Sequence, residues 1–575
     1  MRLKIVKLAG FFVFIFLSSV LFSFQFVRAK KYREQSDKNC LRLVPQEGCR
    51  GRILDSEGSV IADSKLSYDV MFFPQGESNF NKVLANVSGI LELKLKASKS
   101  ADKFVRVASS MPVTIAKNIG IKKAIALEEM KLENPGLIVL PVPVRRYPNE
   151  RLACHIIGYL GEIDHWRLTK LEDYGYKTKD IVGFGGIEEK YDYYLRQEEG
   201  GLLSEVDHRG RFTRVLGFRQ PVNGKDIQLT INLKLQKIAE DALSCKKGSV
   251  VVMEPYTGEI LAMASYPNFS PGAFADKNAS SIPVFLNDLD SPLLNRVISG
   301  AYPAGSLFKL IVATAGLETR KINPSTISIC QGSMLIGKKE FNCWGTHNQQ
   351  NLHLAIAHSC NVFFYRAGLI LGPQIIYDYA VKFGLSKSVS FDLCYETSGF
   401  VPSPLRRKIN QFSRFRRENW YDGDTANLSI GQGDVLVTPL QMACMMAVFA
   451  NKGYLVRPYI TKAIDGSETG VFQKKAVCLS LRESTIDEIR RGLREVVSDP
   501  DGTANVLSTL AVSVGGKTGT AQAPPGTSHA WFAGFFPFEN PKYVICVFLE
   551  RGGHGYYSAL VAKQIIEKML EEGLV

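Results

Sequence analysis

Three short strings of residues that could carry acyl-transfer chemistry occur in one order along the chain. They are Ser306-Leu-Phe-Lys309, Ser359-Cys-Asn361 and Lys517-Thr-Gly519. A serine hydroxyl is a weak nucleophile until an adjacent base takes its proton, and residues three apart on a helix share one face. The strings and their order are typical of a serine acyl-transferase whose nucleophile is activated by a lysine.

The residues around the first string favour this chemistry. Tyr302-Pro-Ala-Gly305 predicts a turn that leads into a helix at Ser306, and the start of a helix offers free N–H groups to a developing oxyanion. Apolar neighbours on both sides of Lys309 exclude water from its amine, which favours the neutral, basic form. We therefore interpret Ser306 as the nucleophile and Lys309 as the general base. Taken alone, this loose tetrapeptide pattern indicates an ordinary helix start with a surface lysine rather than a catalytic pair.

The second string places a hydroxyl and a side-chain amide two residues apart. Such a pair suits a proton relay by Ser359 and a substrate clamp by Asn361. It suits the N-terminal cap of a helix equally well. The functional interpretation of this string therefore depends on the presence of the other two.

The third string lies on a predicted strand. Lys517, Thr518 and Thr520 offer a cation and hydroxyls to a carboxylate, and Gly519 lets a substrate backbone lie against the strand. The backbone N–H of Thr520 is a candidate for an oxyanion hole, together with that of Ser306. A solvated lysine on an edge strand is the alternative interpretation.

A second cluster of reactive side chains overlaps the second string. Three thiolates and one imidazole complete a tetrahedral set of zinc ligands, and Cys360 lies inside Ser359-Cys-Asn361, where a metal would brace the site. The alternative is disulfides or free thiols, since an exported chain with 11 cysteines cannot pair them all. The four candidate ligands are Cys330, Cys343, His347 and Cys360.

Residues 8–27 form a run of 20 residues without a charge, which is long enough to span a membrane. Basic residues precede the run, as expected when the N-terminus stays inside. The prediction is a cytoplasmic tail over 1–7, a retained single-pass anchor over 8–27, and an exported remainder. A cleaved signal peptide ending at Ala29 is the alternative.

The remaining elements predict two extracytoplasmic domains. A hairpin is expected around Asp55 and Gly58, and residues 80–135 have the pattern of helices. From residue 248 the pattern changes to strands at both ends of a region with helices between them, which predicts an α+β domain around one antiparallel sheet. The composition shifts near Thr230, so the boundary is placed after residue 230, between one domain over 28–230 and a second over 231–575.

The net charge of +14 raises the question of nucleic-acid binding. The sequence contains no helix-turn-helix, zinc-finger or RNA-binding signature, so no nucleic-acid partner is expected. Attraction to an anionic membrane or an anionic cell-wall precursor explains the positive charge more simply.

The chain resembles the class B penicillin-binding proteins over nearly its whole length. These are membrane-anchored DD-transpeptidases that cross-link peptidoglycan. Trp420-x-x-Gly423-Asp424 and His529-Ala-Trp531 are similar to the elongation-type branch. The other shared motifs are Arg50-Gly-x-Ile-x-Asp55, Arg146-Tyr-Pro148, Gly186-Ile-Glu188 with Tyr191, Glu254-Pro-Tyr-Thr-Gly258, Tyr302-Pro-Ala-Gly-Ser306, Gly431-Gln-Gly433 with Thr438-Pro439, and Lys517-Thr-Gly-Thr-Ala-Gln522.

The resemblance implies a role for each residue of the three strings. Ser306 attacks a terminal D-Ala-D-Ala, Lys309 is the base, Ser359 relays the proton and Asn361 holds the substrate amide. The terminal carboxylate is recognised by Lys517, Thr518 and Thr520 beside Gly519. Elongation-type relatives carry a structural zinc near the second string, often with aspartate ligands, so the cysteine-rich set here is a departure. Catalysis itself needs no cofactor.

The resemblance also implies partners and a location. The substrates are peptidoglycan stem peptides on a lipid-linked precursor, and β-lactams acylate the same serine. Domain 28–230 is the family's pedestal, or dimerisation-type domain, which contacts partners such as a polytopic SEDS-family glycan polymerase and other elongation-complex proteins. The protein is expected in the cytoplasmic (inner) membrane with its catalytic domain in the periplasm.

Three other functions remain open on sequence grounds. A division-type (septal) transpeptidase has the same catalytic residues. A DD-carboxypeptidase or a β-lactamase uses the same strings but passes the acyl group to water. A catalytically silent scaffold for a glycan polymerase is the third possibility, and the intact nucleophile, base and relay argue against it.

Overall fold

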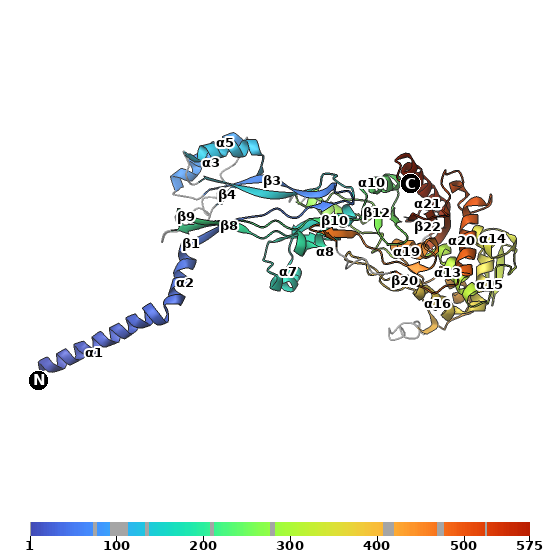
Figure 1. Ribbon diagram of the computed structural model, residues 1–575, viewed down its shortest axis with the longest axis horizontal. Coiled ribbons are helices and arrows are strands. Elements are labelled where there is room, and N and C mark those ends of the chain that lie inside the picture. Colours follow the sequence, from blue (N-terminus) through green and yellow to red (C-terminus); the bar gives the residue numbers. More distant parts are fainter. Residues whose placement is uncertain are drawn as a thin grey trace. The chain divides into compact units, whose positions relative to one another are not determined.

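The computed structural model describes residues 2–72, 77–91, 113–132, 137–206, 212–275, 282–405, 419–468, 476–523 and 526–575 (Figure 1). The chain folds into two compact units. The first comprises residues 1–51, 64–146 and 196–225, and the second comprises residues 52–63, 147–195 and 226–575. Each unit is therefore assembled from separate stretches of the sequence, and the chain passes from one to the other within β3 (Val60–Phe72).

The apolar N-terminal run forms a continuous helix. α1 spans Arg2–Phe22, and a π-helical turn, η1, follows at Ser23–Val27. In the part of the chain that the structure describes, this is the one helix long and apolar enough to cross a membrane, over Lys7–Val27, and none of that window is buried. The predicted span of 8–27 falls within it. α2 (Ala29–Cys40) follows.

The first unit is built mainly of antiparallel strands. β1 (Leu41–Gln46) pairs with β8 (Gly200–Val206), which pairs with β9 (Phe212–Arg219). β3 pairs with β4 (Val113–Ile119), and β5 (Leu137–Arg146) also pairs with β3. The helices α3 (Glu77–Leu91) and α5 (Ile121–Glu129) pack on these strands around a buried cluster that includes Val83, Val87 and Leu127.

The prediction of helices throughout residues 80–135 was wrong in part. α3 and α5 are helical, but Val113–Ile119 is strand β4. Val113, Thr114 and Ile115 are β-branched, which favours a strand, and pairing with β3 decides the conformation. Residues 92–112, which the same prediction covered, lie outside the described residues.

The second unit begins with short elements. The predicted hairpin at Asp55 is confirmed, because β2 (Ile53–Leu54) pairs with β3 and the Asp55 N–H donates to the Ser59 carbonyl. β6 (Tyr159–Glu162) pairs with β7 (Ile181–Phe184). The other elements that precede the large sheet of this unit along the chain are α6 (Cys154–Ile157), α7 (His165–Leu171), α8 (Gly186–Lys190), α9 (Asp192–Leu195) and β10 (Ile227–Leu229).

A five-stranded antiparallel sheet forms the centre of the second unit, in the order β12-β11-β23-β22-β21. Almost every residue of its strands is buried, so both faces are covered. The predicted α+β class is confirmed. The strands are β11 (Gly248–Met253), β12 (Ile260–Tyr266), β21 (Gly515–Ala523), β22 (Thr527–Phe536) and β23 (Tyr543–Leu549).

Helices cover the two faces of this sheet (Figure 1). α10 (Leu233–Leu243) and α21 (Gly555–Glu571) pack together on one face, and α19 (Pro439–Ala450) and α20 (Glu483–Ser498) pack on the other. All twelve residues of α19 are buried. Its sequence PLQMACMMAVFA has almost no polar side.

A group of helices and short strands lies beside strand β21 and holds the first two strings. A 3₁₀ turn, η4 (Gly305–Phe308), continues directly into α13 (Lys309–Glu318). α14 (Leu352–Ala357) and α15 (Asn361–Leu371) flank the second string. The neighbouring elements are β13 (Ser328–Cys330), β14 (Ser333–Ile336), β15 (Lys339–Asn342), β16 (Asn348–Gln350), α16 (Pro373–Lys382) and α18 (Asp422–Ser429).

Candidate active site

Ser306 and Lys309 lie on one side of a single tight turn. Ser306 is in the 3₁₀ turn η4, and Lys309 is the first residue of α13. A 3₁₀ helix has three residues per turn, so positions i and i+3 are eclipsed. The structure thus starts the helix more tightly than the sequence predicted, and this brings positions 306 and 309 into line. Ser306 is half-buried and Lys309 is fully buried.

The Lys309 amine is the centre of a small polar network. Its Nζ donates to the Ser359 carbonyl oxygen at 2.7 Å and to the Asn361 Oδ1 at 2.7 Å, and lies 3.2 Å from the Ser359 Oγ. Burial lowers the pKa of Lys309 to about 8. A neutral amine has two hydrogens and one lone pair, and the two shortest bonds use both hydrogens. The lone pair is then left to accept a proton from a hydroxyl.

Ser359 is held in an unusual backbone conformation. Its φ is 54°, in the left-handed region that residues other than glycine rarely adopt. Such strain persists where surrounding structure enforces it, and it concentrates at functional sites. Here it turns the Ser359 carbonyl and hydroxyl toward the Lys309 amine, just before α15 begins at Asn361.

Asn361 is fixed from three directions. Its backbone N–H donates to the Cys343 sulfur at 3.2 Å, its Nδ2 donates to the Asn342 carbonyl at 3.2 Å, and its Oδ1 accepts from Lys309. The amide orientation follows from these partners, because one end faces a donor and the other a carbonyl. The sequence also allowed Ser359 and Asn361 to serve only as the N-terminal cap of a helix. That interpretation does not account for these contacts, because the N-cap residue of α15 is Cys360.

The third string lies on β21, the edge strand of the catalytic sheet, and the free side of this strand faces η4. Two glycines allow this close approach. A Cβ on Gly305, whose φ is 56°, would lie 2.9 Å from the Thr520 carbonyl oxygen. A Cβ on Gly519 would lie 3.1 Å from the Trp531 Cβ and 3.4 Å from the Ala304 carbonyl oxygen. Glycine therefore sets the narrow spacing between the nucleophile turn and the strand.

The side chains of the third string differ in exposure. Lys517 is fully buried, with its Nζ donating to the Thr518 carbonyl at 3.0 Å. Burial, and next the nearby Lys309 charge, lower its pKa well below the usual lysine value. Thr518 is buried and Thr520 is half-buried. Lys517 therefore lies buried close enough to Lys309 for their charges to interact, and Thr520 is the member of the string nearest to solvent.

Three residues that sequence reasoning did not assign to the site hold the third string in place. The Thr518 Oγ1 donates to the Thr503 Oγ1 at 2.7 Å. The Gly555 N–H, at the start of α21, donates to the Thr520 Oγ1 at 3.0 Å, and Gln432 Nε2 donates to the Thr520 carbonyl at 3.3 Å. Gln432 lies in a quoted motif, Gly431-Gln-Gly433, but nothing in the sequence connected it to position 520.

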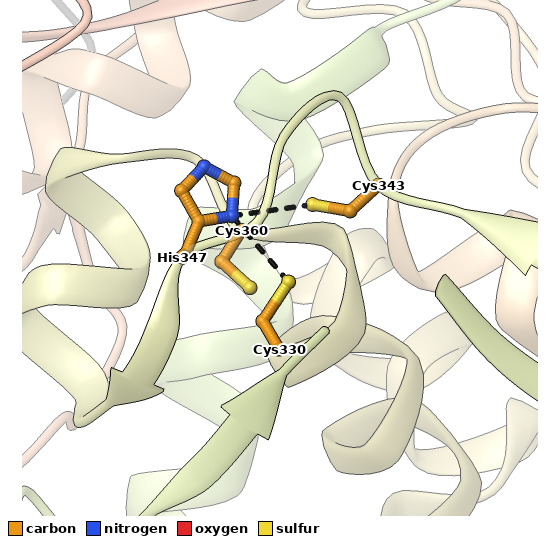
Figure 2. Close-up of side chains that lie close together, drawn as sticks. All are labelled: Cys330, Cys343, His347 and Cys360. Carbon is orange, nitrogen blue, oxygen red and sulfur yellow. Dashed lines mark hydrogen bonds between the residues drawn. The ribbon is translucent and has the colours of Figure 1, made fainter. Parts of the chain in front are cut away.

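The four predicted metal ligands are brought together by the fold (Figure 2). Their ligand atoms all lie within 4.8 Å of one another. The His347 Nδ1 lies 3.5 Å from the Cys330 sulfur and 3.4 Å from the Cys343 sulfur. Ligands about 2.0–2.3 Å from a tetrahedral zinc lie roughly 3.3–3.8 Å from each other, so the two distances from His347 fit such a site.

The chemistry of the donor set fits a metal as well. The imidazole nitrogen that faces the sulfurs is Nδ1, whereas the buried Nε2 of His347 has no hydrogen-bond partner in the described part of the chain. The hydrogen bond from the Cys360 thiol lowers the pKa of Cys343 well below its usual value. A thiolate at Cys343 also accounts for the N–H bond it accepts from Asn361. The cluster therefore touches the catalytic string directly.

Two family models match the chain. Residues 45–229 match the penicillin-binding protein dimerisation domain. Residues 248–571, more than half of the chain, match the penicillin binding protein transpeptidase domain. The strings at 306, 359 and 517 all fall within the second match.

Known proteins resemble the chain over most of its length. The peptidoglycan D,D-transpeptidase MrdA of Acinetobacter baumannii is 30% identical over 569 residues, covering 94% of this chain and 83% of that protein. The structure of a complex between penicillin-binding protein PBP2 and MreC from Helicobacter pylori matches with a TM-score of 0.78 and 28% identity, covering 93% of this chain and all of that one. A structure described as a peptidoglycan synthase complex that coordinates polymerization and crosslinking matches with a TM-score of 0.74 and 28% identity, over 98% of this chain and 97% of that one.

Proposed function

This chain belongs to the class B penicillin-binding proteins and is a peptidoglycan D,D-transpeptidase of the elongation (MrdA) type, and from that premise we propose that Ser306 is its acylated nucleophile. The observation that carries this assignment is the fully buried Lys309 amine, one tight turn after Ser306 and bonded to both Ser359 and Asn361. The division-type, carboxypeptidase and β-lactamase alternatives are not favoured by relatives named D,D-transpeptidase MrdA.

Acylation begins with transfer of the Ser306 hydroxyl proton to the lone pair of the neutral Lys309 amine. The Ser306 Oγ bonds to the penultimate D-alanine carbonyl carbon of a stem peptide, with the backbone N–H groups of Ser306 and Thr520 as donors to the oxyanion. The carbon–nitrogen bond to the terminal D-alanine then breaks, and its amine takes the proton from Lys309 through the Ser359 hydroxyl. Asn361 holds the amide of the donor peptide.

Deacylation reverses the proton path. The amine of a second stem peptide attacks the ester carbonyl and loses a proton to the Lys309–Ser359 network, and Ser306 leaves and regains its hydrogen. The products are a new amide cross-link and the free enzyme. A β-lactam reacts by the same first step, because its strained amide acylates Ser306. The amine released from that amide stays attached to the acyl group, so it does not leave the site.

Recognition of the terminal carboxylate is assigned to the third string. Thr520 supplies a hydroxyl donor beside Gly519, and the buried Lys517 supplies the cation. Thr518 holds this part of the strand in place through its hydrogen bond to Thr503. An arriving carboxylate favours the ammonium form of Lys517, which burial alone disfavours. The carboxylate of the bound substrate therefore supplies the negative charge that pairs with the Lys517 ammonium.

The candidate anchor and the pedestal support a location of this chemistry outside the membrane. We infer that 1–7 is cytoplasmic, that 8–27 crosses the inner membrane once, and that 231–575 is a periplasmic transpeptidase domain carried on pedestal residues 28–230. The apolar helix over Lys7–Val27 and the dimerisation-domain match over 45–229 support this order. The likeness to PBP2 in a complex with MreC and to a peptidoglycan synthase complex supports elongation-complex proteins and a SEDS-family polymerase as partners.

We also assign a structural zinc to Cys330, Cys343, His347 and Cys360. When bound, such a metal supplies rigidity and fixed thiolates rather than catalysis. Cys343 then holds the Asn361 backbone through its sulfur, and Cys360 fixes the residue between Ser359 and Asn361. The structure supports this assignment through the compact, correctly spaced donor set.

Metal analysis tests the zinc assignment on the purified full chain in detergent. One zinc per chain is expected, and His347→Ala should lose it while Cys478→Ser, at an exposed cysteine, should keep it. A metal-free protein in which Cys330, Cys343 and Cys360 do not react with a thiol reagent would instead establish disulfides. A metal-free protein in which these thiols react would also exclude the assignment.

Labelling with a fluorescent penicillin tests the catalytic assignment. The full chain should form a covalent adduct, and Ser306→Ala should form none. Ser244→Ala is the matched control, since Ser244 is an exposed serine outside the three strings, and its labelling should equal that of the parent. An adduct on folded Ser306→Ala protein would show that another residue is the nucleophile.

A further inference from the structure

Two aromatic rings far apart in the sequence meet beside the three strings. The Trp344 and His554 ring centroids lie 6.4 Å apart with an interplanar angle of 75°, which is an edge-to-face arrangement. Trp344 lies between β15 and β16, in the loop that joins Cys343 to His347 (Figure 2), and His554 is the N-cap residue of α21. Neither residue has a role in the proposed mechanism.

Trp344 is tied to the second string. Its Nε1 donates to the His358 carbonyl at 2.9 Å, and His358 immediately precedes Ser359. Trp344 itself follows Cys343, whose sulfur accepts the Asn361 N–H. The position of the indole is therefore coupled on both sides to the segment that contacts the Lys309 amine.

His554 is tied to the third string. It precedes Gly555, whose N–H donates to the Thr520 Oγ1 at 3.0 Å. The residue before it, Gly553, donates its N–H to the Ser528 carbonyl on β22 at 2.9 Å. The imidazole is thus positioned by the β21–β22 end of the catalytic sheet.

The contact between the two rings consequently connects the second string with the third. In the proposed mechanism the donor peptide lies between these two strings. In the proposed mechanism a donor uses Asn361 for its amide and Thr520 for its carboxylate. Trp344 is one residue from the partner of Asn361, and His554 is one residue from the partner of Thr520.

The Trp344 indole is also exposed in a way that core packing does not explain. Its exposed fraction is 55%, although its Nε1 is bonded and its ring contacts His347 at 4.8 Å between centroids as well as His554. Tryptophan buries large apolar area when a partner is available, so a fixed and half-exposed indole is suited to contact a ligand. His554 is exposed as well.

We propose that Trp344 and His554 form an aromatic latch that a donor must separate to reach Ser306, so that the pair determines how fast donors of different size acylate the enzyme. This inference rests on the proposed function. A donor with a bulky acyl side chain displaces the latch, whereas a small one passes without doing so. The pair acts on specificity and takes no part in the proton transfers.

The test compares two penicillins on the full chain in detergent. The probes are benzylpenicillin and the aminopenicillanic acid nucleus without a side chain, and intact-protein mass spectrometry gives the second-order acylation rate constant of each. Because an edge-to-face contact changes an equilibrium by about two- to tenfold, His554→Ala and Trp344→Phe should each raise the benzylpenicillin rate constant by that factor. The rate constant for the nucleus should stay within about twofold of the parent value.

Two further measurements separate a latch from a structural effect. The double variant should equal the single variants rather than multiply their effects, because one contact can be lost only once. The emission of Trp344, obtained as the parent spectrum minus that of Trp344→Phe, should change on acylation by benzylpenicillin with the rate constant of adduct formation. Trp166→Phe is the matched control at another exposed tryptophan, and its acylation rates should equal those of the parent.

The outcomes are distinguishable. If the parent is not acylated by either penicillin, the proposed function fails. If the parent is acylated but His554→Ala keeps its benzylpenicillin rate constant, or changes both rate constants equally, the latch is excluded and the function stands. His554→Ala alone decides the matter if Trp344→Phe does not fold, since the His554 side chain makes no capping bond to α21.

Discussion

The amine of Lys309 lies 2.7 Å from the side-chain oxygen of Asn361, a residue 52 positions further along the chain. This bond connects the first catalytic string with the second and leaves the lysine no access to bulk water. The same Asn361 is held through its backbone by the Cys343 sulfur. The proposed proton acceptor, the proposed substrate clamp and the candidate metal cluster therefore form one connected unit.

The rate of acylation should rise with pH through about 8. Burial lowers the pKa of Lys309 to about 8, and only the neutral amine can accept the Ser306 proton. Below that pH the neutral fraction falls about tenfold per unit, and above it the rate reaches a plateau. Benzylpenicillin acylation measured from pH 6 to 10 checks this, and a rate that is flat or falls between pH 6 and 8 would contradict it.

Replacing Lys309 by methionine should abolish acylation while the protein stays folded. Methionine keeps most of the side-chain volume, and loss of a general base costs about 10²- to 10⁴-fold in rate. The melting temperature should not fall by much, because a buried amine is replaced by an apolar group. Lys321→Met is the control, since Lys321 is exposed, follows the C-terminal end of α13, and bonds the last carbonyls of α15. Parent-like acylation by Lys309→Met would remove lysine from the mechanism.

Alanine at Gly305 should impair both stability and acylation. The left-handed φ costs any alanine about 1 kcal/mol, and the new Cβ would lie 2.9 Å from the Thr520 carbonyl oxygen. Gly466→Ala measures the cost of the left-handed φ alone, because Gly466 has φ 73° but open space around it. Denaturant unfolding should show a larger loss for Gly305→Ala, and only that variant should acylate slowly. Equal effects would mean that β21 does not constrain the nucleophile turn.

Valine at Thr503 should slow acylation without unfolding the protein. Thr503 accepts the hydrogen bond of the Thr518 hydroxyl, and losing that partner costs about 1 kcal/mol, or roughly five- to tenfold in rate if the hydroxyl must be oriented. Thr509→Val provides the comparison, because the Thr509 hydroxyl bonds only the Val506 carbonyl at the surface. Acylation rate constants and melting temperatures for both variants check this. An unchanged rate for Thr503→Val would show that Thr518 needs no support.

Some features of the site could be read directly from the sequence because their causes are local. The spacing of Ser306 and Lys309 follows from helical periodicity, and the β11–β12 hairpin follows from its turn residues. The metal-ligand types were also recognisable, since Cys and His are rare enough to stand out at regular spacing. Strand β4, which interrupts the helices predicted over residues 80–135, was not predicted. A short β-branched run becomes a strand here only because β3 pairs with it.

The sequence by itself determined the candidate catalytic residue types, the α+β class and an apolar helix long enough to span a membrane, since each depends on neighbouring residues. Only the tertiary structure decided that Lys309 bonds Asn361, that Lys517 is fully buried, and that Thr503 and Gly555 support the third string. These contacts join positions distant along the chain. Their formation depends on how the sheet and helices pack together, and no local pattern of residues encodes that packing.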